Sequence, residues 1–350
     1  MSGAQWRCPP QASALLRNDW ANLPPPQEFL AHQSPHIDVE GVPACPVCGS
    51  GQFEPVAIGF DYESLTCRNP WRFVRCGVCG HVWLNPRPAL STLPIIYPPT
   101  YYAYDYSTRV SPLAVKGKAL LDRFKMNSIL RHCRKPVRAY LDIGCGDGHF
   151  LRVLEARGLS RDRLYGIDLD ERAIAALVRQ GYRAFCERVE ICADIPPGTF
   201  DLVTMFHVIE HVDKPAAVLQ RILSWLAPGG ILAVETPNIH SFDARLFQEG
   251  YWGGYHIPRH WNLFHPASLA RLLADNGYTV TATEFQTGHS FWMYSFHHAL
   301  RYGDTPQARF AKWFDPFSNL PLLTLFTGFD RLRATIGYKT SAMLMIASKD

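Results

Sequence analysis

The sequence lacks a long apolar run and a strong excess of one charge, and it shows no recognisable signal pattern. No apolar stretch reaches the ~18–20 residues that a membrane-spanning helix needs, and the best candidate, residues 320–329, contains Pro321 and Gly328. No basic start followed by an apolar segment marks a secretory signal, so we expect a cytoplasmic protein without a transmembrane segment. The 35 Lys and Arg residues are interspersed with 31 Asp and Glu residues, and a net charge of +4 is too small to indicate nucleic acid as a partner.

The ten cysteines are not spread along the chain as a disulfide framework would be. Four of them form two C-x-x-C pairs, each followed by glycine and separated by residues 49–75. Two residues between cysteines let both sulfurs face one ion, and four thiolates suit tetrahedral Zn²⁺. The sequence therefore predicts a structural zinc ribbon in a reducing compartment. The predicted ligands are Cys45, Cys48, Cys76 and Cys79. Four unligated buried cysteines are the alternative, and Cys67 and His81 are rival ligands without a partner at ligand spacing.

From residue 138 the sequence alternates short apolar runs, glycine-rich turns and segments with helical periodicity. This alternation predicts an α/β fold, a doubly wound parallel sheet with helices on both faces. The predicted strands are 139–143, 164–167, 183–186, 202–206, 231–235, 279–284 and 342–348, and the predicted helices are 113–133, 150–156, 171–180, 216–226 and 266–276. The predicted domains are an irregular extension (1–40), a zinc ribbon (41–90), a Tyr-rich connector and helix (91–137), the sheet core (138–286), an aromatic helical insertion (287–340) and a last core strand (341–350).

A glycine-rich loop lies where the first predicted strand turns into a helix. Its glycines are Gly144, Gly146 and Gly148, and they let the backbone approach a ligand closely. A dinucleotide is the runner-up ligand, but its G-x-G-x-x-G pattern needs a third glycine where this chain has His149. Asp142 and Asp147 are poor neighbours for a pyrophosphate and good ones for a cation, which favours S-adenosylmethionine. Asp168 ends the next strand, where an acidic side chain can accept both ribose hydroxyl hydrogens.

At this point the sequence resembles the class I S-adenosylmethionine-dependent methyltransferases. The motifs that carry the resemblance are 141–148 (LDIGCGDG), 166–169 (GIDL), 200–203 (FDLV), 207–211 (HVIEH) and 227–230 (APGG), all within 138–286. The cysteine pairs resemble bacterial methyltransferases with an N-terminal zinc ribbon, often associated with glycan or natural-product biosynthesis. Residues 85–88 (NPRP), 235–238 (ETPN) and 258–260 (PRH) fit that subgroup.

The resemblance implies a Rossmann-like, mostly parallel, seven-stranded sheet and a cofactor site at its strand ends. It implies that the loop lines the methionine moiety, that residues after the second and third strands hold ribose and adenine, and that the end of the fourth strand lies near the transferred methyl. Cys186 and Glu187 compete for the adenine position. The cofactor residues expected in this way are Asp142, Gly144, Cys145, Gly146, Asp168, Leu169, Glu187, Phe206 and His207.

Histidines are dense after the fourth and fifth predicted strands. Ligands of open parallel sheets bind outside the carboxyl ends of the strands, so these imidazoles are placed to act on an acceptor. Methyl transfer to a hydroxyl needs a group that removes its proton, and neutral histidine is the natural base. The candidate catalytic residues are His207, Glu210, His211, His256 and His260. Each has a structural alternative, such as capping a helix or packing in the long loop 236–265, which we expect to cover the substrate.

The sequence thus predicts a methyltransferase that acts on a small molecule such as a sugar, a glycan or a secondary metabolite, most simply at oxygen. An RNA methyltransferase that grips nucleic acid with its ribbon is the alternative, but residues 41–88 carry four basic and three acidic residues, which weakens phosphate contacts. A non-catalytic scaffold is the third reading. The aromatic stretch 291–329 is expected to pack over the sheet edge or in a homodimer, with a membrane surface or an apolar substrate as alternatives.

Overall fold

The computed structural model describes residues 19–98, 112–248, 250–303 and 307–349. Contacts divide the chain into two compact units, each built from several stretches of sequence. The ribbon unit comprises Met1–Pro98, Pro237–His265 and Gln286–Ala342, and the sheet unit comprises Pro99–Thr236, Pro266–Phe285 and Met343–Asp350. Two parts of the predicted domains lie outside the described residues: residues 1–18 of the extension, and the connector segment that contains the tyrosines at positions 101, 102, 104 and 106.

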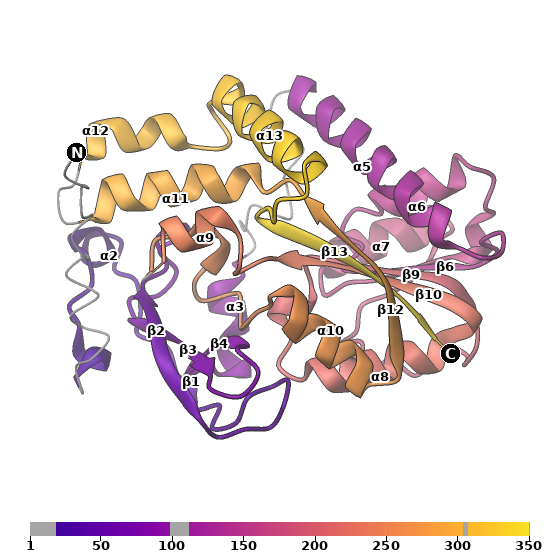
Figure 1. The fold of residues 1–350 in the computed structure, drawn as a ribbon, viewed down its shortest axis with the longest axis horizontal. Coiled ribbons are helices and arrows are strands. Elements are labelled where there is room, and N and C mark those ends of the chain that lie inside the picture. The colour runs from indigo at the N-terminus through magenta and orange to yellow at the C-terminus, as the bar shows by residue number, and fades with distance from the viewer. Residues whose placement is uncertain (1–18, 99–111, 249, 304–306, 350) are drawn as a thin grey trace. The chain divides into compact units, whose positions relative to one another are not determined.

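A seven-stranded sheet forms the centre of the sheet unit, in the order β12-β13-β10-β9-β6-β7-β8. Figure 1 labels five of its strands, β12, β13, β10, β9 and β6. Its strands are β6 (Tyr140–Ile143), β7 (Leu164–Ile167), β8 (Arg183–Phe185), β9 (Phe200–Phe206), β10 (Leu226–Pro237), β12 (Tyr278–Gln286) and β13 (Ala342–Lys349). β8, β7, β6, β9 and β10 pair in parallel, with Leu141 opposite both Tyr165 and Val203. The chain runs outward from β6 to β8 and then returns to β9, so the strand order reverses between β6 and β9. Ligands bind at such a switch point, and the predicted fold class is confirmed.

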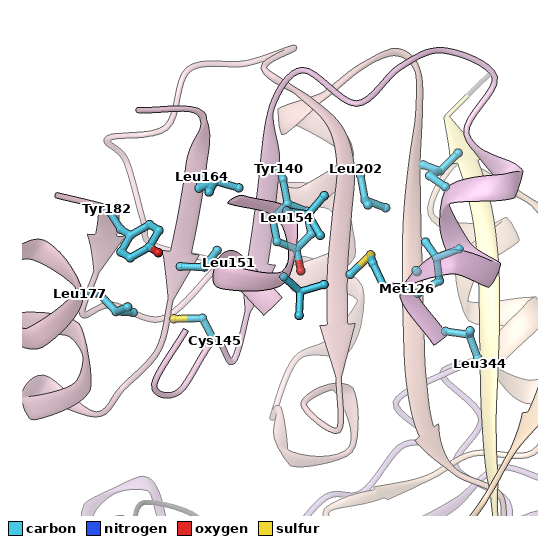
Figure 2. Packing of buried hydrophobic residues seen from close by; sticks show 14 of the residues in the cluster. Met126, Tyr140, Cys145, Leu151, Leu154, Leu164, Leu177, Tyr182, Leu202 and Leu344 are labelled. Carbon is cyan, nitrogen blue, oxygen red and sulfur yellow. The ribbon is translucent and has the colours of Figure 1, made fainter. Parts of the chain in front are cut away.

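Helices complete the sheet unit. They are α5 (Pro112–His132), α6 (His149–Glu155), α7 (Glu171–Arg179), α8 (Pro215–Trp225) and α10 (Pro266–Asp275), with short 3₁₀ turns η4 (Arg161–Arg163) and η5 (Ile209–His211). Asp170 caps the N-terminus of α7, and its carboxylate accepts from the amides of Arg172 and Ala173 at 2.9 and 3.2 Å. Leu151 and Leu177 come from helices and Leu164 and Leu202 from strands, and all four are fully buried in one core (Figure 2).

The predicted elements of the sheet unit are present with ends that differ by a few residues. β10 differs most, because it starts at Leu226 instead of at the predicted residue 231 and therefore includes residues 228–230. Its pairing with β9 is irregular there, between Leu226 and Ile231. The preceding helix α8 ends at Trp225, so the glycines at 229 and 230 lie within the strand and not at the end of the helix.

The ribbon unit contains a four-stranded sheet in the order β11-β4-β3-β2 and a two-stranded ladder of β1 and β5. Its strands are β1 (Val39–Glu40), β2 (Phe53–Gly59), β3 (Trp71–Cys76), β4 (Val82–Leu84), β5 (Arg87–Pro88) and β11 (Asn262–Leu263). β11 comes from the long loop, and Asn262 and Leu263 pair with Trp83 and Val82. The loop thereby completes the ribbon sheet.

Two buried pairs fix the same loop inside the ribbon unit. Arg259 contacts Asp61 at 3.0 Å, and both side chains are fully buried. His256 Nδ1 lies 2.6 Å from Glu63 Oε2, again between buried side chains. Arg259 also donates to the carbonyl of Ile96 at 2.9 Å, so its guanidinium is satisfied on several sides. The segment predicted to cover the substrate is therefore a packed part of the ribbon unit.

The aromatic insertion is helical, as expected from its sequence. Its elements are α11 (His289–Tyr302), α12 (Ala308–Ala311), η7 (Lys312–Phe314) and α13 (Leu320–Thr335). The other described helices of the ribbon unit are short. They are η1 (Trp20–Asn22), α2 (Gln27–Ala31), η2 (Leu90–Thr92), α3 (Leu93–Ile96), α9 (Phe242–Leu246) and η6 (Gly253–Tyr255). α2 gives the extension more order than expected, because Phe29 is fully buried and Glu28 pairs with Arg301 at 2.8 Å. Among the described residues, no helix is long and apolar enough to cross a membrane.

Candidate functional site

The three glycines of the loop after β6 have a left-handed backbone conformation that residues with side chains rarely adopt. Gly144, Gly146 and Gly148 have φ of +74°, +49° and +82°. A Cβ on Gly144 would lie 2.4 Å from Val208, and one on Gly148 would lie 2.5 Å from Leu177. A Cβ on Gly146 would meet nothing within 4 Å. The outer glycines therefore permit packing, whereas Gly146 leaves open space beside the backbone, as a bound cofactor requires.

Asp168 ties this loop to the end of β7. One carboxylate oxygen accepts from the Gly146 amide at 2.8 Å, and the other accepts from the Asp170 amide at 3.0 Å. The amide of Gly144 donates to the carbonyl of Ile167 at 2.8 Å. A carboxylate has about four acceptor positions, so Asp168 retains capacity for two further donors such as ribose hydroxyls.

Asp142 lies buried at the end of β6, behind the loop. It accepts a hydrogen bond of 2.7 Å from Thr204, whose hydroxyl lies 2.6 Å from that of Tyr140. Burial, together with the charges of Asp168 and Asp147, raises the pKa of Asp142 to about 7 despite the Thr204 hydrogen bond. A cation at the loop would stabilise the ionised form of Asp142, which fits the ammonium and sulfonium of S-adenosylmethionine.

The remaining cofactor candidates differ in exposure. Cys145 is buried under the loop, and a Cβ on Gly166 would lie 2.7 Å from its sulfur. Leu169 is 61 % exposed directly after Asp168, so it offers an apolar surface beside the predicted ribose position. Glu187 is exposed after β8. Phe206 closes β9 with its ring 4.8 Å from that of Phe150.

His207 follows Phe206 and lies between two carboxylates. Its Nδ1 is 3.2 Å from Glu210 Oε1, and its Nε2 is 3.4 Å from Glu235 Oε1. Both carboxylates are buried, whereas the imidazole side chain is 41 % exposed. Burial lowers the pKa of His207, but hydrogen bonds and charge from Glu210 and Glu235 outweigh it and raise the pKa to about 9. At neutral pH this ring is an imidazolium that donates to both carboxylates.

Helix α5 supplies the counter-charge of Glu235. Lys125 Nζ lies 2.5 Å from Glu235 Oε2. Burial raises the pKa of Glu235, but Lys125 and His207 lower it to about 2. Asp122, one turn earlier on α5, pairs with Lys118 at 2.6 Å and lies 3.2 Å from His149 Nε2. Lys125 on α5, Glu235 on β10 and His207 after β9 therefore form a chain of alternating charges.

Sequence reasoning did not assign Lys125, Asp122 or Glu235 to the site. Lys118, Asp122 and Lys125 recur at i, i+4 and i+7 of α5, which places them on one side of that helix. That spacing is also typical of an ordinary solvated helix face, so the sequence alone does not single it out. Glu235 stands out only as the first residue of the 235–238 motif.

The other catalytic candidates are divided between the two units. His211 ends η5 in the sheet unit and is partly buried. His256 and His260 belong to the ribbon unit, where their rings lie 4.9 Å apart. His260 Nδ1 lies 2.8 Å from the carbonyl of Gly254. These contacts give both ribbon histidines structural partners, and their catalytic roles stay predictions.

The four predicted zinc ligands converge. The sulfurs of Cys45, Cys48, Cys76 and Cys79 all lie within 4.8 Å of one another. The Cys45–Cys79 and Cys48–Cys76 sulfur distances are 3.6 and 3.5 Å, close to the ~3.8 Å edge of a tetrahedron with ~2.3 Å zinc–sulfur bonds. Gly49 and Gly80, with φ of +72°, make the turn after each pair. The donor set fits Zn²⁺ and leaves no open coordination position.

Comparisons with known proteins agree with this geometry. A family model described as a methyltransferase domain matches residues 98–283, which is more than half of the chain. The chain belongs to this methyltransferase family. The prediction of an S-adenosylmethionine-dependent methyltransferase is thereby confirmed, whereas zinc is supported by the cysteine cluster alone.

Individual relatives are similar over the same region. A ubiquinone biosynthesis O-methyltransferase of Neisseria meningitidis serogroup C is 29 % identical over 182 residues, covering 48 % of this chain and 75 % of the relative. Its serogroup A counterpart is 31 % identical over 162 residues, covering 43 % of this chain and 67 % of the relative. A SAM-dependent methyltransferase structure from Archaeoglobus fulgidus has a TM-score of 0.43 and 20 % identity, covering 66 % of this chain and 94 % of the other.

Proposed function

We propose that this methyltransferase transfers the methyl group of S-adenosylmethionine to an oxygen of a small-molecule acceptor, such as a sugar or a natural product. The glycine loop tied to Asp168 at the switch point of the sheet is the observation that carries the proposal. Relatives named O-methyltransferases support oxygen as the acceptor atom. The cofactor supplies an electrophilic methyl group when bound.

The residues at the loop bind and orient the cofactor in this proposal. The carboxylate of Asp168 accepts from the ribose hydroxyls, and Leu169 with Glu187 borders the adenine. Gly144, Gly146 and the backbone of Cys145 border the methionine moiety, and the negative charge of Asp142 favours its cationic groups. Phe206 borders the reacting centre at the end of β9.

His207 is the proposed proton acceptor. Only its neutral form can take a proton from the acceptor hydroxyl, and doing so restores the imidazolium that Glu210 and Glu235 stabilise. The two carboxylates thus strengthen the base while reducing the fraction of neutral ring at pH 7. Glu210 also accepts from the hydroxyl of Thr236 at 3.0 Å, which fixes its orientation. His211, His256 and His260 remain the alternative proton acceptors.

Zinc bound by the four cysteines is proposed as a structural ion of the ribbon. All four positions of the tetrahedron are filled by protein sulfur, so the ion has no position for substrate. The amides of Val78 and Cys79 point at the sulfur of Cys76, at 3.4 and 3.5 Å, and stabilise its thiolate form.

Titration calorimetry on an Asp168→Ala variant tests the cofactor assignment. Losing the charged hydrogen bonds of this carboxylate should weaken S-adenosylmethionine binding by roughly ten- to a hundredfold, since such bonds contribute about 1.5–3 kcal/mol. Asp170→Ala is the matched control, because it removes the helix cap of α7 next to the same loop. Equal affinity of Asp168→Ala and wild type would refute the role of Asp168. Product mass analysis with labelled cofactor and candidate acceptors then identifies the methylated oxygen.

A further inference from the structure

The inner face of helix α13 is fixed by a buried carboxylate. Asp330 is fully buried and accepts from the Gly288 amide at 2.9 Å, from the Trp292 indole at 3.1 Å and from Arg333 at 3.1 Å. On the same side, the Phe326 ring stacks on that of Trp292 with centroids 5.6 Å apart. These contacts determine which face of α13 points away from α11.

The outer face of α13 is a continuous apolar stripe. Leu325, Phe329 and Leu332 follow one another at intervals of four and three residues, which places them within about 60° of arc at 100° per residue, and Ile336 follows directly as the C-terminal cap of the helix. They are 65 %, 42 %, 62 % and 61 % exposed. Phe329 lies at the edge of the stripe, since its ring also packs edge-to-face against that of Trp292 with centroids 5.6 Å apart. A helix at a water-facing surface normally carries polar side chains on this face. Such a stripe marks an interaction surface.

The exposed charges of α13 and of the segments that directly precede and follow it in the sequence have one sign. Within the described residues 307–340 there are five basic and two acidic residues. Asp330 is buried and Asp315 is half-buried, so every exposed charged side chain in this range is basic. These exposed cations are Arg309, Lys312, Arg331 and Lys339. Trp313 and Tyr338, each next to one of these cations in the sequence, are 63 % and 61 % exposed.

We propose that the outer face of α13 docks onto the surface of a bilayer with anionic headgroups. The stripe enters the boundary between headgroups and acyl chains, and the four cations contact the phosphates. Trp and Tyr favour this interface because their rings are apolar at one end and polar at the other. A second copy of the chain fits less well, because a two-fold contact through this face would bring the same cations together.

Flotation of the full chain with vesicles tests the proposal. Vesicles of phosphatidylcholine with a quarter phosphatidylglycerol should carry the protein, and pure phosphatidylcholine vesicles should carry much less. Added salt should weaken binding. Lys312→Gln with Arg331→Gln should reduce binding roughly 30-fold, at about fivefold per cation near an anionic surface. Leu325→Gln with Leu332→Gln should reduce it more than tenfold.

Helix α7 offers matched controls, because it also exposes an apolar residue and two cations. Val178→Gln, and Arg172→Gln with Arg179→Gln, should leave vesicle binding unchanged. All variants change exposed side chains, so unfolding temperatures within a few degrees of wild type verify the fold. Absence of wild-type binding to anionic vesicles would overturn the proposal, as would unchanged binding of the double-leucine variant. A dimer that dissociates in that variant, without vesicle binding, would assign the face to a second copy.

Discussion

The protonation state of His207 decides whether this residue can act as the base in the proposed reaction. A free histidine has a pKa of about 6.5 and is mostly neutral at pH 7. Two buried carboxylates hold both ring nitrogens of His207 and raise its pKa to about 9. The pH at which this base becomes available is therefore set by Glu210 and Glu235.

We predict that kcat rises with pH until about 9 if His207 takes the acceptor proton. Below that pH the neutral fraction of the ring grows about tenfold per pH unit, and above it the fraction saturates. A pH–rate profile under saturating cofactor and acceptor checks this, with His207→Ala showing a loss of about 10²–10⁴-fold. A plateau that begins near pH 6.5 would exclude His207 as the base. A rate that declines above pH 9 would mean that the imidazolium is the active form.

Lys125 offers a second residue-scale prediction. It neutralises Glu235 at 2.5 Å, so Lys125→Met leaves the charge of Glu235 acting on His207 without compensation. The pKa of His207 should rise further, by about one unit. NMR titration of the His207 ring measures this without any turnover. Lys118→Met is the control, because Lys118 pairs with Asp122 and is half-exposed. Equal His207 pKa values in the two variants would contradict the charge chain.

The sequence predicts the cofactor side of the site better than the proton-transfer side. The loop glycines and Asp168 are close together in the chain or separated by one predicted strand and helix, so strand order alone brings them together. Lys125 and Glu235 are far apart in the sequence, and Lys125 lies on a helix with no motif. Their pairing depends on the packing of α5 beside β10, which periodicity does not specify. Likewise, the raised pKa of His207 depends on burial of its two partners.

At the scale of elements, the ribbon sheet is completed by β11, a strand that lies far outside the predicted ribbon segment 41–90. β11 has two residues, too few for any strand pattern, and His81 lies 3.2 Å from Asn262, 181 residues later. Sequence reasoning located the two cysteine pairs, because local spacing defines them. It could not predict that loop 236–265 supplies the fourth strand, since this pairing is entirely non-local.

The zinc proposal is tested on the same element. Purified protein should contain about one zinc per chain, and Cys48→Ser should lose most of it, because three sulfurs and a hydroxyl bind Zn²⁺ more weakly. Cys67→Ser is the control, since Cys67 is buried in the ribbon core and outside the four-sulfur cluster. Metal analysis together with thermal unfolding separates metal loss from unfolding. Full zinc content in a folded Cys48→Ser variant would refute the ligand set.

At the scale of the whole molecule, the two units interleave along the chain. The ribbon unit takes residues from the N-terminal part, from the connection after β10 and from the segment between β12 and β13. Each unit nevertheless has buried hydrophobic clusters of its own. The predicted methyltransferase core, residues 138–286, includes the connection after β10. The contacts of this connection instead group it with the ribbon.

This interleaving gives the last prediction, on hydrogen exchange after zinc is removed with a chelator. Residues 256–265 should exchange faster together with residues 45–84, because β11 pairs with β4 and His265 Nε2 lies 3.2 Å from the carbonyl of Cys79. Residues 140–143 and 200–206 should keep their protection, since their strands pair within the other sheet. Exchange by mass spectrometry at peptide resolution distinguishes the outcomes. Faster exchange confined to 45–84 would contradict the prediction, because the loop would then keep its protection without the ribbon strands on which it packs. Faster exchange in both units would show that they unfold as one.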